Sequence, residues 1–246
     1  YTTIDAGKVR DAMIAKGLSV LSVKRTFITI KAIINLAIAE HGLDMRNPFS
    51  SIFMPEEHPS KRVSIPVDTI RSIQQTCYTI DDDMRWLVAL ISDTGMRLAE
   101  AAGLHIDDIH LEEEIPYVDI RPHSWRSLKT KGSQRQVPLL GASLWAAQRI
   151  RANASSCFAF PRYTDKENCN ANSASNALNK WLKTKFRDDI VIHGFRHAIR
   201  DRLRATNCPS EMIDQIGGWA STSVGKNYGL GYDLKTLQNT LVKTKF

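Results

Sequence analysis

Residues 191–204 read VIHGFRHAIRDRLR, and the chain then reaches Trp219 within IGGWAS and Tyr228 within GKNYG. His193 and Arg196 are three residues apart, so they share one face of a helix. Further on, Trp219 offers an indole N–H donor and Tyr228 a phenol. A cationic pair at the start of a predicted helix, followed by these two groups, is suited to holding a phosphate and attacking it.

A second arginine motif lies upstream. Residues 94–100 read TGMRLAE and contain Arg97 and Glu100. The segment before them predicts a helix that breaks at Gly95. Three consecutive aspartates at 81–83 suit the N-terminus of that helix. A metal-binding cluster is the alternative, but consecutive carboxylates splay apart rather than converge on an ion.

One region of the sequence predicts β-structure. Residues 116–120 predict a short strand, and residues 125–130 and 135–139 predict two strands on either side of a hairpin-like turn at 131–134. Helical periodicity dominates the rest of the chain. The fold class is therefore mainly α with a small antiparallel β-sheet (α+β).

The composition is that of a globular protein, and its net charge is positive. The chain has 246 residues, of which 43% are hydrophobic and 24% charged, and its net charge is +7. Such an excess of positive charge suggests an acidic binding partner, and nucleic acid is the first candidate. The four cysteines include no Cys-x-x-Cys pair, which argues against a zinc site or a disulfide framework and fits a reducing cytoplasm. No apolar run approaches the ~20 residues of a membrane span.

Taken in order, these motifs resemble those of the tyrosine recombinases, the phage integrase family. The resemblance runs over residues 22–246 and implies the catalytic domain of that family at residues 65–246, including a C-terminal helix at 233–246. Residues 56–64 carry mixed charge without periodicity and predict an interdomain linker.

Residues 1–55 are expected to form part of the family's helical, DNA-contacting core-binding domain. Apolar residues recur at helical spacing between Ser22 and Glu40, which predicts a helix packed on a core. The chain then reads RNPF at 46–49, similar to the end of that domain. Because the family usually has more helix before this point, we expect the domain to be truncated here.

The resemblance implies a role for each motif residue. Arg97 and Arg196 would clamp the two non-bridging oxygens of a DNA phosphodiester, because a guanidinium matches such oxygens bidentately. Tyr228 would be the nucleophile, and His193, which titrates near neutral pH, would accept its proton. Family members carry a catalytic lysine on the β-hairpin in a Lys-Thr context, so Lys129 would protonate the departing 5′ oxygen.

Several of these positions leave alternatives open. Lys131 is the alternative to Lys129, and both could instead be solvated turn lysines that touch backbone phosphates. Trp219 stands where most of the family has histidine; its N–H can donate to a phosphate but cannot move a proton. Glu100 would orient a neighbouring cation or form an i,i+3 ion pair without function. Tyr232 is a second tyrosine, at the wrong spacing from Trp219. The helix predicted after His193 could also have no catalytic role and only present a basic stripe to DNA, formed by Arg196, Arg200 and Arg204.

The resemblance implies a site-specific DNA recombinase or integrase that cleaves and rejoins strands through a 3′-phosphotyrosyl intermediate. The alternatives are a type IB-like topoisomerase and a non-catalytic DNA-binding protein on the same scaffold. This chemistry requires no cofactor or metal, and the chain has neither a Walker loop nor the separated carboxylates of a two-metal site.

The implied partners are double-stranded DNA with attachment or recombination sites, and further copies of the chain that form a tetramer at synapsis. The resemblance also implies that no membrane is involved and that the protein acts in the cytoplasm of a bacterium, with a phage or integrative element as the source. The last residues predict an amphipathic helix with leucines at 234, 237 and 241. This helix would either fold back on its own domain or, as is common in the family, pass to a neighbouring protomer.

Overall fold

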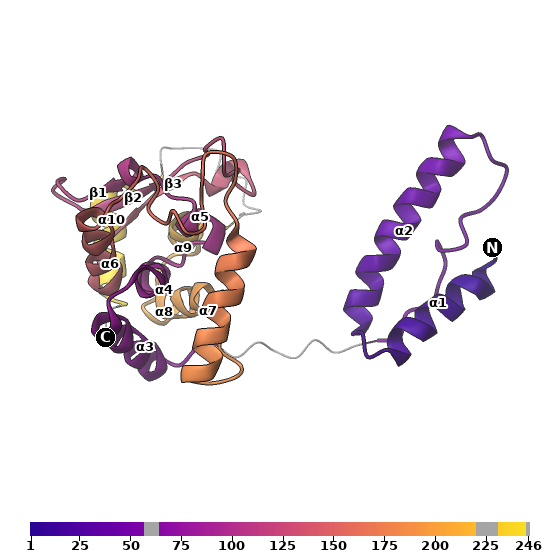
Figure 1. Cartoon of the computed structure of the whole chain (residues 1–246), viewed down its shortest axis with the longest axis horizontal. Helices are drawn as coiled ribbons and strands as arrows, with labels where there is room; N and C mark the ends of the chain where they lie inside the picture. Colours follow the sequence, from indigo (N-terminus) through magenta and orange to yellow (C-terminus); the bar gives the residue numbers. More distant parts are fainter. Residues whose placement is uncertain (57–63, 220–230, 245–246) are drawn as a thin grey trace. The chain divides into compact units, whose positions relative to one another are not determined.

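The computed structural model describes residues 1–56, 64–219 and 231–244, and the chain divides into two compact units, Tyr1–Arg62 and Val63–Phe246 (Figure 1). Each unit has its own packing and is described by itself. Within the described residues, no helix is long and apolar enough to span a bilayer.

The described part of the first unit, residues 1–56, contains two helices. Helix α1 (Thr3–Ala15) begins with a capping box, in which the Thr2 hydroxyl accepts from the Asp5 amide and the Asp5 carboxylate accepts from the Thr2 amide. Ser19 caps helix α2 (Val20–Glu40) through the Ser22 amide. The helix predicted after Ser22 is thus confirmed, whereas α1 was not predicted.

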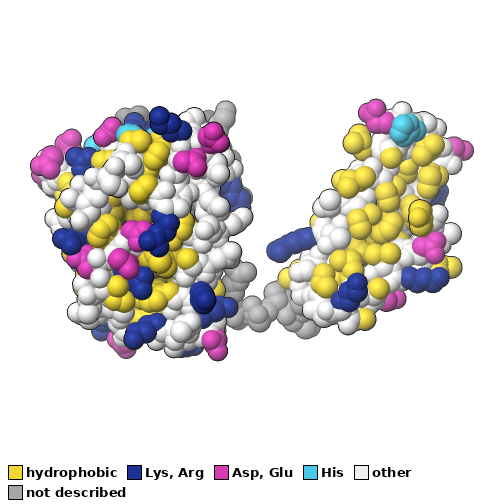
Figure 2. Space-filling model, viewed as in Figure 1, with side chains coloured by type: hydrophobic (Ala, Val, Ile, Leu, Met, Phe, Trp, Pro, Cys, Tyr) yellow, Lys and Arg dark blue, Asp and Glu magenta, His cyan; other side chains and the backbone are white. Residues whose placement is uncertain are grey.

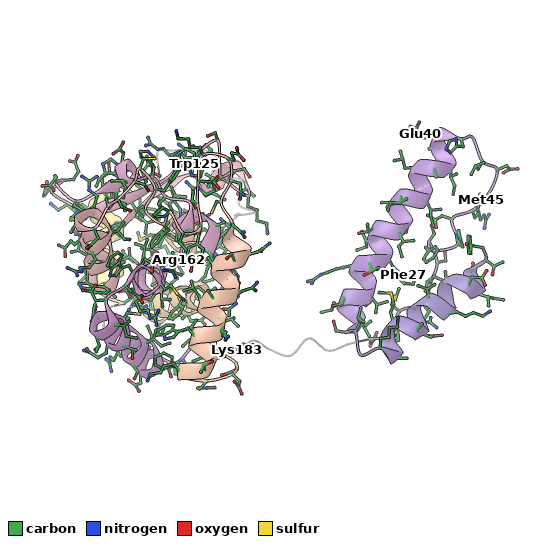
Figure 3. The ribbon with its side chains drawn as sticks, viewed as in Figure 1. Phe27, Glu40, Met45, Trp125, Arg162 and Lys183 are labelled. Atoms are coloured by element: carbon green, nitrogen blue, oxygen red, sulfur yellow. The ribbon has the colours of Figure 1, made fainter. Side chains whose placement is uncertain are left out.

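The segment after α2 folds back onto it through Asn47. The Asn47 side-chain amide donates to the Lys31 carbonyl at 2.9 Å and to the Asn35 side chain at 2.6 Å, and its oxygen accepts from the Phe49 amide at 2.9 Å. Phe49 then meets Phe27 edge to face, with ring centroids 5.2 Å apart. Phe27 lies on the side of α2 that faces α1 (Figure 3).

Much of the apolar surface of α2 stays open in this unit. Only Val23 and Phe27 of the helix are buried. Ile28, Ile33 and Leu36 are 69%, 63% and 62% exposed, and Figure 2 shows hydrophobic side chains gathered on the visible face of the unit. The prediction of a helix packed on a core is therefore only half right, because the described part of this unit covers one side of α2.

The second unit is helical around α4. Helix α4 (Asp83–Thr94) lies in the middle, and α3, α6 and α8 pack against it (Figure 1). The Asp82 carboxylate accepts from the Arg85 amide at 3.0 Å, which confirms the predicted helix start. The other α-helices among the described residues of this unit are α3 (Val67–Ile80), α5 (Leu98–Ala102), α6 (Gly141–Ala152), α7 (Ala171–Lys185), α8 (Gly194–Ala205), α9 (Ser210–Gly217) and α10 (Leu234–Val242).

A small antiparallel sheet lies at one end of this unit. Its strands run in the order β1 (Ile109–His110), β2 (Tyr117–Ile120) and β3 (Arg135–Pro138). Val118 pairs with Ile109 on one side and with Val137 on the other. Together with the helices, this sheet confirms the α+β fold class.

The predicted strand at residues 125–130 is wrong. Strand β3 pairs directly with β2, and the segment between them keeps only a single bridge between His123 and Arg126. Two side chains join this segment to α5 and its end: the Trp125 indole donates to the Gly103 carbonyl at 3.0 Å, and the Arg126 guanidinium donates to the Glu100 carbonyl at 3.3 Å. These contacts hold a loop where the sequence predicts a hairpin arm.

Helix α10 packs on its own unit. Leu237 and Leu241 are buried in a second hydrophobic cluster with residues of α8 and α9. The Arg202 guanidinium of α8 donates to the Thr244 carbonyl just past the helix, at 3.1 Å, and to the Asp93 carboxylate of α4, also at 3.1 Å. In this single chain the helix folds back on its own unit, and its packing on a neighbouring protomer in a DNA-bound assembly stays a prediction.

We expect Leu237→Ala to lower the free energy of unfolding by about 2–5 kcal/mol, because it leaves a cavity in this second cluster. Val242→Ala on the same helix is the matched control: Val242 is 47% exposed, and its truncation should cost no more than about 0.5 kcal/mol. Urea denaturation measures both. Equal losses in the two variants would mean that α10 is not docked in solution.

Candidate active site

Arg97 lies where two helices meet. Gly95 ends α4 with a left-handed backbone (φ 62°), and Arg97 then occupies the N-cap position of α5. Its guanidinium is fixed from three sides: Nη1 donates to Glu100 Oε1 at 2.6 Å and to Ser133 Oγ at 3.1 Å, and Nη2 donates to the Gly218 carbonyl at 3.0 Å. The side chain keeps about a quarter of its surface exposed, at 23%.

Glu100 is buried between two arginines. Besides Arg97, its carboxylate accepts from Arg135 Nη2 at 2.9 Å. Burial alone raises the pKa of this carboxyl, but the charge and hydrogen bond of Arg135, with the hydrogen bonds from Arg97, outweigh it and hold the pKa below its ordinary value. Glu100 is therefore a permanent anion that orients Arg97, and Arg135 is a partner that the sequence reasoning missed.

Arg196 is buried on the first turn of α8. Its Nη1 donates to the Gly95 carbonyl at 2.7 Å, and its Nη2 is buried with no hydrogen-bond partner among the described residues. Burial, and then repulsion by Arg97 and Arg135, lowers the pKa of Arg196 to about 9. A buried N–H left without an acceptor costs about 1–3 kcal/mol, and more when charged, so this group favours an anion.

Trp219 lies against two guanidiniums. Gly218 ends α9 with a left-handed backbone (φ 61°), and the next residue's ring sits 4.3 Å from the Arg196 guanidinium and 4.9 Å from that of Arg200. A Cβ on Gly217 would meet the indole ring, so this close approach requires glycine there. Arg196 thus belongs to a buried cluster rather than to a solvated basic stripe.

His193 occupies the N-cap position of α8 and is exposed. Its ring lies edge to face with that of His197, with centroids 5.1 Å apart. His197 was not singled out from the sequence, although its spacing of four residues from His193 places both on one helix face.

The two candidate lysines lie in the segment that leads into β3. Lys129 is exposed, and Lys131 begins a short 3-10 helix (Lys131–Ser133). This segment is joined to the arginine site, because the Ser133 hydroxyl contacts both Arg97 and the Thr130 hydroxyl, the latter at 2.9 Å. The choice between the two lysines stays open.

The predicted nucleophile, Tyr228, lies outside the described residues. Tyr232 is described, and its backbone is held by Gln215: the Tyr232 amide donates to Oε1 at 2.9 Å, and Nε2 donates to the Tyr232 carbonyl at 2.8 Å. The structure therefore brings together Arg97, Glu100, Arg196 and Trp219, with His193 at the start of the same helix as Arg196.

Solved structures share this fold. A Tn1549 transposon integrase in complex with a circular intermediate DNA matches with a TM-score of 0.67 and 17% identity, covering 99% of this chain and 85% of the other. A lambda integrase tetramer bound to a Holliday junction gives 0.66 and 16%, covering 91% and 66%. XerA recombinase gives 0.52 and 17%, covering 100% and 78%. A search of curated proteins found no match.

The family comparison covers most of the chain. Residues 64–230 match the phage integrase family, and this segment contains both arginine motifs, the sheet and the segments on either side of Trp219. The match agrees with the fold described above. The chain belongs to the phage integrase family, that of the tyrosine recombinases.

Proposed function

We propose that the chain is a site-specific DNA recombinase that cleaves and rejoins strands through a 3′-phosphotyrosyl intermediate. The observation that carries this proposal is the buried Arg196 Nη2, which has no acceptor among the described residues although it lies beside Arg97 and Trp219. Two guanidiniums in one partly buried site repel each other, and a phosphodiester between them relieves that repulsion.

The proposed step balances without a cofactor. The Tyr228 oxygen attacks phosphorus while the bond from phosphorus to the 5′ oxygen breaks. His193 accepts the phenol proton, and Lys129 gives a proton to the leaving oxygen. Arg97 and Arg196 hold the charge that develops on the non-bridging oxygens. The phosphotyrosyl bond conserves the energy of the broken bond, so a second 5′ hydroxyl can reverse the step on a partner strand.

The wider assembly follows by similarity. The first unit would be the partial core-binding domain and would contact double-stranded DNA, with residues 56–64 as the linker. The Tn1549 and lambda integrases were captured on DNA, the latter as a tetramer on a Holliday junction. We propose the same partners for this chain: duplex DNA carrying a recombination site, and further copies of itself.

The test is covalent attachment to nicked DNA. Duplexes selected by the protein from a random library would be footprinted and then nicked inside the protected sequence, so that the cleaved fragment diffuses away. We expect a protein–DNA band that survives denaturing electrophoresis. A mobility shift without such a band would refute the enzyme, and relaxation of supercoils without exchange between two marked duplexes would favour a topoisomerase.

Lys129→Ala is expected to slow this cleavage by about 10²–10⁴-fold, the usual contribution of a general acid. A substrate with sulfur at the 5′ bridging position has a leaving group that needs no proton, so it should recover most of the loss. Lys131→Ala is the paired variant. Recovery by sulfur in Lys131→Ala alone would move the acid to that residue.

A further inference from the structure

Arg135 is a deeply buried cation next to Arg97 and Glu100. It begins strand β3, and its side chain is only 3% exposed. Each nitrogen of its guanidinium reaches a different part of the chain: Nε donates to the Ile216 carbonyl at 2.8 Å, Nη1 to the Ser133 carbonyl at 2.7 Å and Nη2 to Glu100 Oε2 at 2.9 Å. Burial therefore costs this cation its water but leaves none of its three nitrogens without an acceptor.

All three acceptors of Arg135 lie in residues or segments that also hydrogen-bond to Arg97. Glu100 accepts from Arg97 Nη1, and the Ser133 hydroxyl accepts from the same nitrogen. The third, Ile216, precedes Gly218, whose carbonyl accepts from Arg97 Nη2. The backbone at Gly218 also packs closely on Arg135, since a Cβ there would come within 2.5 Å of Nη1.

Stability alone does not account for this arrangement. A buried ion pair contributes little net stability, because removing two charges from water offsets their attraction. Burial also lowers the pKa of Arg135, although the neighbouring Glu100 opposes that shift. What the three contacts supply is geometry: they set α5, the turn before β3 and the end of α9 at fixed positions relative to one another.

We propose that Arg135 is a positioning residue that holds Arg97, the lysine-bearing turn and the segment entering Trp219 in one arrangement for catalysis. It acts through Arg97 and touches no substrate itself. The catalytic part of this inference rests on the proposed function.

Arg135→Lys tests the proposal because lysine keeps the charge opposite Glu100 but cannot reach three acceptors in a planar fork. Arg202→Lys is a matched control: Arg202 is also buried, and it also donates to two backbone carbonyls, those of Ser92 and Thr244, and to one carboxylate, that of Asp93. Both variants would be compared with the wild type at matched folded fraction.

We expect Arg135→Lys to slow single-turnover cleavage of the nicked duplex by about 10²-fold, the scale of a 1 Å misplacement, with unchanged Kd for DNA. Arg202→Lys should cleave at nearly the wild-type rate. Adding Arg135→Lys to Arg97→Lys should slow the reaction little further, because both act on one group. Equal losses in Arg135→Lys and Arg202→Lys, or additive losses in the double variant, would reduce Arg135 to a structural residue.

A readout without DNA separates this inference from the proposed function. The guanidinium N–H signals of Arg97 in an NMR spectrum of the free protein can be assigned by their loss in Arg97→Lys. They should shift and exchange faster with water in Arg135→Lys and stay unchanged in Arg202→Lys. Unchanged Arg97 signals in Arg135→Lys would overturn the positioning role, whereas a wild type that forms no covalent adduct would refute only the recombinase.

Ser133→Ala is a second variant that tests the same proposal if Arg135→Lys does not fold. This variant keeps the Ser133 carbonyl that Arg135 uses and removes only the hydroxyl that contacts Arg97 and Thr130. If Arg135 holds Arg97, the Arg97 signals should persist and cleavage should fall much less than in Arg97→Lys. A loss as large as that of Arg97→Lys would assign the positioning to the hydroxyl instead.

Discussion

Tyr228→Phe is expected to abolish covalent attachment to the nicked duplex while leaving DNA affinity nearly unchanged. The substitution deletes a single oxygen, the proposed nucleophile, and keeps the aromatic ring, so it should affect the attack on phosphorus and not DNA affinity. Denaturing electrophoresis measures the adduct, and a mobility shift on the same samples measures binding. Loss of both together would indicate that Tyr228 is needed for folding or binding rather than for attack.

Tyr232→Phe is the matched control. The two backbone hydrogen bonds with Gln215 and the contact of its side chain with the second hydrophobic cluster fasten this tyrosine to α9. A residue held in this way is poorly placed to move toward a phosphate, so Tyr232→Phe should keep the adduct. An adduct that persists in Tyr228→Phe and disappears in Tyr232→Phe would exchange the two roles.

Helix α4 of the second unit could be predicted because its signals are local. Asp82 caps it, and Gly95 ends it in a left-handed conformation. Helix α1 was not predicted because its apolar residues do not gather on one face and only Ala6 is buried. What starts α1 is the reciprocal pair Thr2 and Asp5, a short signal that the apolar pattern hides.

The loop at 125–130 could not be predicted from its own residues. Its sequence has the length and flanking turn of a hairpin arm, but β2 takes β3 as its partner and Trp125 is drawn to a carbonyl at Gly103. That acceptor lies in a distant part of the sequence, so no local pattern reveals it. Tertiary contacts decided between loop and strand here.

The arginine site was predicted in part. Arg97, Glu100 and Arg196 were singled out by their motifs, and the structure brings them into one cluster with Trp219. Arg135 was missed, although strand alternation offers a signal: it shares the buried face of β3 with Val137, whereas Gln136 between them is exposed. An arginine on a buried strand face implies a carboxylate partner nearby.

Trp219 illustrates what a motif cannot supply. The sequence suggested an N–H donor to phosphate, and the structure adds a role for the ring face, which lies against the guanidiniums of Arg196 and Arg200. An indole ring can hold a guanidinium in place by cation–π attraction without taking a hydrogen-bond donor away from the phosphate. Donation by its N–H stays a prediction.

The second large effect is expected when the buried guanidinium of Arg196 is removed. Arg196→Met should slow covalent attachment by about 10³–10⁵-fold, the range for an arginine that stabilises a phosphoryl transition state. Arg196 Nη1 also donates to the Gly95 carbonyl, two residues before Arg97, so the substitution could disturb the fold there. Circular dichroism of Arg196→Met therefore accompanies the rate measurement and shows whether the variant is folded. Arg200→Met, which removes only the more exposed of the two cations on Trp219, is the control and should lose far less.

Arg196→Lys adds a pH dependence whose sign follows from the site. Burial and the neighbouring guanidiniums already lower the pKa of the arginine from 12.5 to about 9. A lysine starts from a lower ordinary pKa of about 10.4, and the same surroundings lower it further, so a lysine here loses its charge at a lower pH than the arginine does. The charged fraction, and with it the cleavage rate, should then fall as the pH rises from 6 to 8, while the wild type keeps its guanidinium charged throughout. Single-turnover rates of Arg196→Lys divided by those of the wild type at each pH isolate this effect from any pH dependence that the two proteins share. A ratio that stays constant over that range would mean that position 196 is solvated in solution and that the buried clamp does not form.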